Sequence, residues 1–154
     1  MKSFIEWNKE LSVDIQELDE QHKVLVDILN RLHEAIITRT DLIIINDIFT
    51  ELVQYTIVHF AVEESLMRIF DYPFYEDHKK HHEQLTKQVI DLQKKARTGD
   101  ISASMALWKF LRKWLTNHIL IEDKKYSLFF LKCGLKKHWA ERSWTGKIWD
   151  YIHS

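Results

Sequence analysis

The stretch INDIFTELVQYTIVHFAVEESL, residues 45–66, decides the fold because one side of it mixes apolar side chains with a histidine and a glutamate. The residues on that side recur every three or four positions: Ile45, Phe49, Leu52, Thr56, His59, Glu63 and Leu66. This spacing places them on one face of an α-helix, which buries that face against other helices. His59 and Glu63 are therefore expected inside the protein.

Three other stretches have the same rhythm and predict three further helices. They run from Leu18 to Ile36, from His78 to Ala96 and from Leu107 to Ile121. The connections are short, and Asp41 and Gly99 are typical of a helix start and a helix end. Because short connections join antiparallel neighbours, we expect an all-α fold, an up-down-up-down four-helix bundle.

The rest of the chain flanks this bundle, which we assign to residues 18–133. Residues 1–17 are less periodic and are expected to form an N-terminal arm, anchored by Phe4, Ile5 and Trp7. Residues 134–154 form a C-terminal extension with three tryptophans, Trp139, Trp144 and Trp149. We expect the extension to pack on the bundle. The alternative is that it docks a partner protein or another copy of the chain.

Composition excludes several classes of protein. The chain has 154 residues, a length typical of one domain, and only four residues are glycine or proline, which disfavours an all-β fold. The formal net charge of −1 gives no indication of nucleic-acid binding. The sequence shows no secretory signal and no transmembrane segment, and its single cysteine excludes an internal disulfide. We therefore expect a cytoplasmic protein.

Polar residues interrupt the buried face of every predicted helix. They are His22, His59, Glu63, His78, His82 and His118. One inward histidine is usually a hydrogen-bonded core residue, but a buried carboxylate is costly unless it is paired or bound to metal. A metal would satisfy all six residues at once, so the pattern favours a metal site over a purely structural bundle.

Neighbouring residues are assigned by their offset from these faces. His81 is expected at the surface, Glu64 at the surface or just outside the site, and His33 in a structural role. Asp123 follows His118 by five residues, which is about 140° around a regular helix. A π-helical widening between them would bring both side chains to the same face.

These motifs, taken in order, resemble the hemerythrin family, and most closely its single-domain bacterial members. The matching elements are Trp7-Asn8, Asp19-Glu20-Gln21-His22, His59-Phe60-Ala61-Val62-Glu63-Glu64, His78-Lys79-Lys80-His81-His82 and His118-Ile119-Leu120-Ile121-Glu122-Asp123. The resemblance covers roughly residues 4–131. It departs from the family at Asp14, where glycine is frequent, and in the C-terminal extension.

The resemblance implies a centre of two iron ions, Fe²⁺ or Fe³⁺, with an oxo or hydroxo bridge. His78, His82 and His118 would hold one iron, and His22 and His59 the other. Glu63 and Asp123 would bridge the two. With this ligand set, one position of two octahedral irons stays open for dioxygen. Trp114 and Leu115 match residues that line the oxygen pocket in the family, and Phe60 and Ile119 are further candidates.

The function implied is reversible dioxygen binding without catalysis, for oxygen storage, delivery or sensing. An oxygen-consuming enzyme is then a candidate partner for the C-terminal extension. Oxygen-activating di-iron proteins in helix bundles use four carboxylates with Glu-x-x-His pairs, whereas this chain offers two carboxylates and five histidines. The alternatives are a di-iron oxidase or peroxidase, a nitric-oxide-handling or iron-handling protein, and a zinc protein. Seven ligands are too many for one tetrahedral zinc ion.

Overall fold

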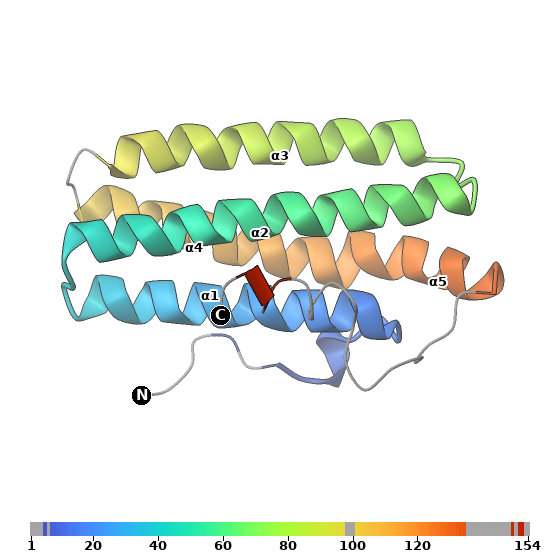
Figure 1. Ribbon diagram of the computed structural model, residues 1–154, viewed down its shortest axis with the longest axis horizontal. Coiled ribbons are helices and arrows are strands. Elements are labelled where there is room, and N and C mark those ends of the chain that lie inside the picture. The colour runs from blue at the N-terminus through green and yellow to red at the C-terminus, as the bar shows by residue number, and fades with distance from the viewer. Residues whose placement is uncertain (1–4, 6, 98–100, 135–148, 150, 153–154) are drawn as a thin grey trace.

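Four long helices run side by side, each antiparallel to the one before it (Figure 1). The computed structural model describes residues 5, 7–97, 101–134, 149 and 151–152. The long helices are α1 (Gln16–Ile37), α2 (Leu42–Ile69), α3 (Tyr75–Ala96) and α4 (Ile101–Asn117). A π-helical segment, η2 (His118–Asp123), joins α4 to α5 (Lys124–Lys132), and a short 3-10 helix, η1 (Lys9–Leu11), precedes α1.

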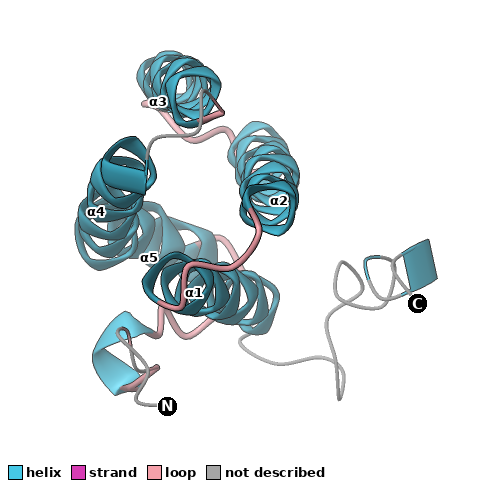
Figure 2. Ribbon diagram, turned by 90° about the vertical axis from the view of Figure 1, so that its left-hand side faces the viewer, coloured by secondary structure: helices cyan, strands magenta, loops and turns pink. Residues whose placement is uncertain are grey.

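The four long helices form a closed bundle in which each helix packs against two others. Each of α1 and α3 contacts both α2 and α4, and the end-on view shows the four helices around a common centre (Figure 2). The predicted all-α bundle is therefore confirmed. The predicted start of the second helix is also confirmed, because the Asp41 side chain accepts a hydrogen bond of 2.8 Å from the Ile43 N–H. Gly99 lies outside the described residues.

The π-helical widening predicted after His118 is present as η2. An extra residue in one turn changes which side chains face the core beyond it. Buried positions in this helix run from His118 to Asp123, Tyr126 and Phe130, a five-residue step followed by steps of three and four. Ile121, expected on the buried face, is 51% exposed, so that assignment was wrong.

The apolar core is divided into two clusters. The larger cluster includes Leu25, Leu29, Phe49 and Leu115. The smaller cluster gathers at the other end of the bundle: Val13, Ile15, Leu18, Val62, Met67, Tyr72, Tyr126 and Phe130. Along α1, His22 lies between residues of the two clusters, and His118 and Asp123 do so along α4 and its continuation. The expected metal ligands thus form a polar layer across the core.

The N-terminal arm is attached to α1 through Asp19. Its carboxylate accepts hydrogen bonds from the Ser12 hydroxyl (2.6 Å) and the Val13 N–H (2.8 Å). Between these residues and α1, Asp14 has a φ of 60°, in the left-handed region that glycine adopts without strain and aspartate tolerates. Ile5 and Trp7 pack against the larger cluster as expected, whereas Phe4 lies outside the described residues.

Within the C-terminal extension, Trp149 contacts the bundle. Its ring meets Tyr55 of α2 edge-on, with 4.6 Å between ring centroids. Trp139 and Trp144 lie outside the described residues. In the described part of the chain, no helix combines the length and the apolar character needed to span a membrane.

Candidate metal centre

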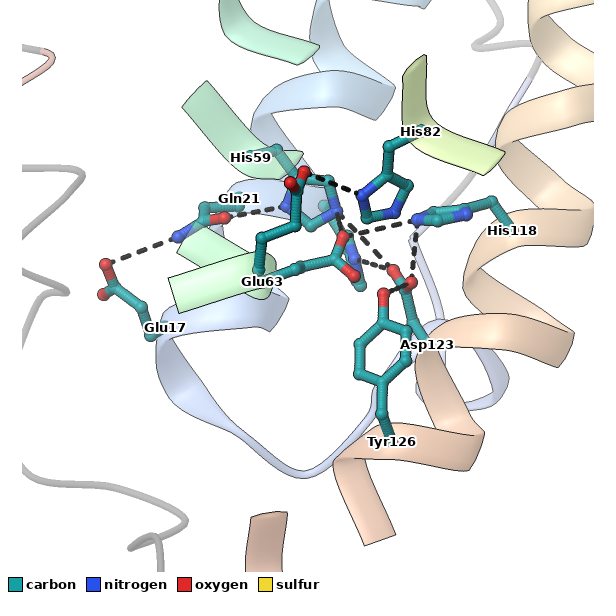
Figure 3. A network of polar contacts seen from close by, with 10 residues as sticks. Glu17, Gln21, His59, Glu63, His82, His118, Asp123 and Tyr126 are labelled. Carbon is teal, nitrogen blue, oxygen red and sulfur yellow. Dashed lines mark hydrogen bonds and ion pairs between the residues drawn. The ribbon is translucent and has the colours of Figure 1, made fainter. Parts of the chain in front are cut away.

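Six of the seven expected ligands converge in the polar layer (Figure 3). These residues fall into two groups, and within each group one ligand atom of each residue, an imidazole nitrogen or a carboxylate oxygen, lies within 4.8 Å of those of the others. One group is His22, His59, Glu63 and Asp123, and the other is Glu63, His82 and His118. Glu63 belongs to both groups, so its two oxygens can serve two neighbouring ions.

Each helix of the bundle supplies part of this layer. His22 comes from α1 and His82 from α3, while His59 and Glu63 share one face of α2 because they are four residues apart. His118 and Asp123 are the two ends of η2. The π-helical turn is the local feature that places both of these side chains in the layer.

The side chains are close enough to contact one another directly. His22 Nε2 lies 2.5 Å from Asp123 Oδ2, and His118 Nε2 lies 2.8 Å from Asp123 Oδ1 and 3.3 Å from Glu63 Oε1. His59 Nε2 also contacts Glu63. These Nε2 atoms and carboxylate oxygens all point toward the same small volume.

Hydrogen bonds from outside the layer fix how the rings are turned. Gln21 Oε1 lies 2.7 Å from His59 Nδ1, and the Gln21 amide donates a bond of 3.3 Å to Glu17. Because that amide nitrogen is the donor to Glu17, the remaining oxygen must accept from His59 Nδ1–H. This arrangement turns His59 Nε2 toward the layer. A hydrogen-bonded outer nitrogen is typical of metal-binding histidines.

Two further outer contacts have the same effect. Glu64 Oε2 lies 3.1 Å from His82 Nδ1, so Glu64 has the second of the two roles expected for it, just outside the site. The Tyr126 hydroxyl donates a hydrogen bond to Asp123 Oδ1. Each contact orients a side chain of the layer from outside the site.

Aromatic rings cover the side of the layer nearest α3 and α4. Phe60 stacks on His82 with 3.8 Å between centroids and a tilt of 2°, and Trp114 stacks on His118 at 5.3 Å. Leu115 is buried in the larger cluster. The side chain of Ile119, the fourth residue expected to line the oxygen pocket, lies outside the described residues.

His78 is the expected ligand that belongs to neither group. It is buried at the edge of the layer, and its Nδ1 lies 3.8 Å from Glu122 Oε2. His81 is exposed, as predicted from its offset. His33 is buried with its ring 4.3 Å from that of Trp108, remote from both groups and in agreement with a structural role.

The buried histidines of the layer differ in the direction in which their pKa values are shifted. Burial alone would lower the pKa of His59 and of His118, but attraction to Glu63 and Asp123 outweighs burial and raises these values to about 9 and about 10. Burial dominates at His82 and lowers its pKa to about 3, and it also lowers the pKa of His78. Although burial opposes ionisation of Glu63 and Asp123, the facing imidazoles lower both carboxyl pKa values.

Several buried polar atoms of the layer have no partner within the protein, and this shows whether the layer fits a metal. Fully buried atoms without a hydrogen-bond or ion-pair partner include Nε2 of His82, Nδ1 of His22 and Oε2 of Glu63. Leaving such atoms unsatisfied costs about 1–3 kcal/mol each. Imidazole nitrogen and carboxylate oxygen are donors suited to iron, so these residues fit a pair of iron ions.

Two residues of the site were not found by sequence reasoning. Tyr126 was signalled by its position three residues after Asp123, which puts the two side chains on one helical face. Gln21 gave no such signal, because it lies beside His22 in sequence yet bonds to His59 on another helix.

The chain is similar to known proteins over most of its length. The family model described as Hemerythrin HHE cation binding domain matches residues 13–127. The bacteriohemerythrin of Stenotrophomonas maltophilia is 36% identical over 121 residues, covering 79% of this chain and 78% of that protein. The bacteriohemerythrin of Methylococcus capsulatus is 34% identical over 119 residues, covering 76% and 88% of the two chains.

A solved structure gives the same assignment. The crystal structure of a wild-type hemerythrin superposes with a TM-score of 0.72 at 30% sequence identity, over 82% of this chain and 97% of that one. The match therefore includes the bundle and the segments that carry the buried histidines and carboxylates. The chain belongs to the hemerythrin family.

Proposed function

We propose that this protein binds dioxygen reversibly at a non-haem di-iron centre. The observation that carries the proposal is the position of Glu63, whose carboxylate belongs to both groups of buried donor atoms. A carboxylate shared in this way suits two metal ions side by side. When bound, the iron pair with its oxo or hydroxo bridge would supply two electrons and one open coordination position for dioxygen.

The proposed ligands are the seven residues of the motif. His82 and His118 would hold one iron together with His78, which we include for its four-residue spacing from His82 on α3. His22 and His59 would hold the other iron. Glu63 and Asp123 would bridge the two, with Asp123 oriented by Tyr126.

The surroundings favour binding over catalysis. Phe60, Trp114 and Leu115 place apolar groups around the imidazoles and would limit access of water and protons to bound dioxygen. The layer itself provides more neutral imidazoles than carboxylates. Less negative charge is therefore available to stabilise highly oxidised iron, so dioxygen should be released intact. A reversible site of this kind would serve oxygen storage, delivery or sensing.

Optical spectra of the iron-loaded protein test the proposal. We expect two irons per chain and visible absorption bands that appear when air reaches the ferrous protein and disappear when oxygen is removed. An oxidase or peroxidase would instead consume oxygen continuously in the presence of a reductant. Bands that do not reverse, or one metal per chain, would contradict reversible binding at a di-iron centre.

A further inference from the structure

His78 differs from the other six proposed ligands in its access to solvent. The residue is 8% exposed, whereas each of the other six is at most 2% exposed. The edge marked by His78 is therefore where the layer is nearest to the surface.

A surface pocket of about 350 Å³ opens onto this edge. His78 lines it together with Asp77, His81, Glu122 and Lys125. Asp77 lies in the first turn of α3, where its charge offsets the positive end of the helix. Glu122 belongs to η2, and its Oε2 is 3.8 Å from His78 Nδ1. Two carboxylates thus face a pocket that has a proposed ligand in its wall.

A second pocket also reaches the layer but is a poorer route for an ion. This groove of about 650 Å³ between α2 and α3 is lined by apolar side chains such as Phe60 and by charges of both signs. The charged residues are Glu64, Glu83, Asp91, Lys87 and Lys94. It ends at His82, which is 1% exposed and whose Nδ1 is already bonded to Glu64. No imidazole is exposed there to receive an ion.

We propose that the pocket between Asp77 and Glu122 is the route by which ferrous iron reaches the polar layer, with His78 as the first ligand to take it. The proposal rests on the di-iron function proposed above. Carboxylates at the mouth of a pocket raise the local concentration of cations and speed their association. Lys125, whose Nζ is 3.7 Å from Glu122 Oε1, is the opposing charge, but such an exposed pair is weak.

The test is the rate at which the iron-free full-length protein takes up ferrous iron without air. Samples are quenched with a chelator at intervals, and bound iron is counted per chain. The double variant Asp77→Asn, Glu122→Gln should load about tenfold more slowly at low salt and still reach two irons per chain. Added salt should slow the unmodified protein more than this variant.

Two further variants make the test specific. Glu83→Gln with Asp91→Asn removes the same number of charges from the other pocket and should load at the unmodified rate. Lys125→Gln removes the opposing charge and should load faster, the opposite direction from the Asp77, Glu122 variant.

Three results would overturn the proposal. The first is that the Asp77, Glu122 variant loads as fast as the unmodified protein, and the second is that the Glu83, Asp91 variant loads more slowly. The third is that the Asp77, Glu122 variant alone ends with fewer than two irons per chain. If the unmodified protein itself never takes up two irons, the di-iron function fails first. The two failures are therefore distinguishable.

Discussion

Glu63 is the single residue on which both groups of buried donors depend. We expect Glu63→Gln, which keeps the size of the side chain but removes its charge, to bind fewer than two irons and to lose the oxygen-dependent absorption bands. An amide bridges two cations poorly, and the two facing imidazoles would lose one of their two carboxylate partners. Metal analysis and the optical spectrum measure both effects.

Two adjacent histidines of α3 provide a test of the same site and its matched control. His82→Ala should reduce the final iron content as Glu63→Gln does, because His82 Nε2 is buried and has no hydrogen-bond partner. His81→Ala should leave the final iron content unchanged, because His81 is exposed. Equal loss in the two variants would show that α3 is rotated relative to the register described here.

The raised pKa values of His59 and His118 make the stability of the iron-free protein depend on pH. Both imidazoles have a pKa near 6.5 when unfolded and about 9 to 10 when folded. Their stabilising contribution is therefore complete below pH 6.5 and lost as the pH rises through the folded values. The melting temperature of the iron-free protein should fall between about pH 6.5 and about pH 10.

Iron should remove this alkaline loss, because imidazoles that bind metal are neutral. The iron-loaded protein is thus expected to keep a nearly constant melting temperature over the same pH range. An iron-free His118→Gln variant should show a smaller alkaline loss than the unmodified iron-free protein. Identical pH profiles for the loaded and iron-free forms would disprove the imidazolium–carboxylate pairing.

At the scale of the element, η2 determines which side of α5 is buried. In a regular helix, deletion of Ile121 would put Asp123, Tyr126 and Phe130 on the same face as His118. We expect this deletion to leave the iron-free protein folded, with its stability changed by about 1 kcal/mol or less, because the buried face is preserved without the π-helical turn. Thermal unfolding followed by circular dichroism checks this expectation.

Deletion of Leu128 is the control for that experiment. Leu128 is also an exposed apolar residue of the same continuous helix. Its deletion rotates Phe130 by about 100° away from the core, at a cost of about 3–5 kcal/mol. If both deletions destabilise the protein equally, the π-helical turn is required for stability in its own right.

Most elements could be predicted because their signals are periodic. The spacing of apolar residues gave the bundle, and the five-residue step from His118 to Asp123 gave η2. The exposure of Ile121 follows from the same step, but it was missed because the alternating steps of three and four residues were extended past His118. A single extra residue in a helical turn therefore changes which of the following residues face the core.

The site was less predictable where it depends on contacts between helices. Sequence spacing identified the residues that face inward, but not which atoms meet. The bond from Gln21 to His59 crosses from α1 to α2, and the position of His78 beside Glu122 depends on how α3 packs against η2. Such contacts follow from packing in three dimensions and have no fixed separation in sequence.

At the scale of the whole molecule, the C-terminal extension should contribute to stability through Trp149. We expect deletion of residues 134–154 to lower the melting temperature and to leave the oxygen-dependent spectrum intact. Trp149 is half-buried against Tyr55, so its loss should cost about 1 kcal/mol and about 2–4 °C. Differential scanning calorimetry of the full-length and shortened chains measures the change.

The point variant Trp149→Ala is the control, because it removes the contact with Tyr55 and keeps the rest of the extension. It should reproduce most of the loss in melting temperature. A shortened chain that is equally stable but no longer self-associates would instead favour the docking role of the extension.

The division of the core into two apolar clusters by a polar layer has a consequence for folding cooperativity. Without iron, the layer holds buried atoms that have no hydrogen-bond partner, so it should couple the two clusters less strongly than continuous apolar packing would. Each cluster can then open as a separate unit. Backbone amides of α5 and of the end of α2 should exchange with heavy water well before those in the middle of α1. With iron bound, ligands from both sides of the layer are tied together, and these amides should exchange in a single global event.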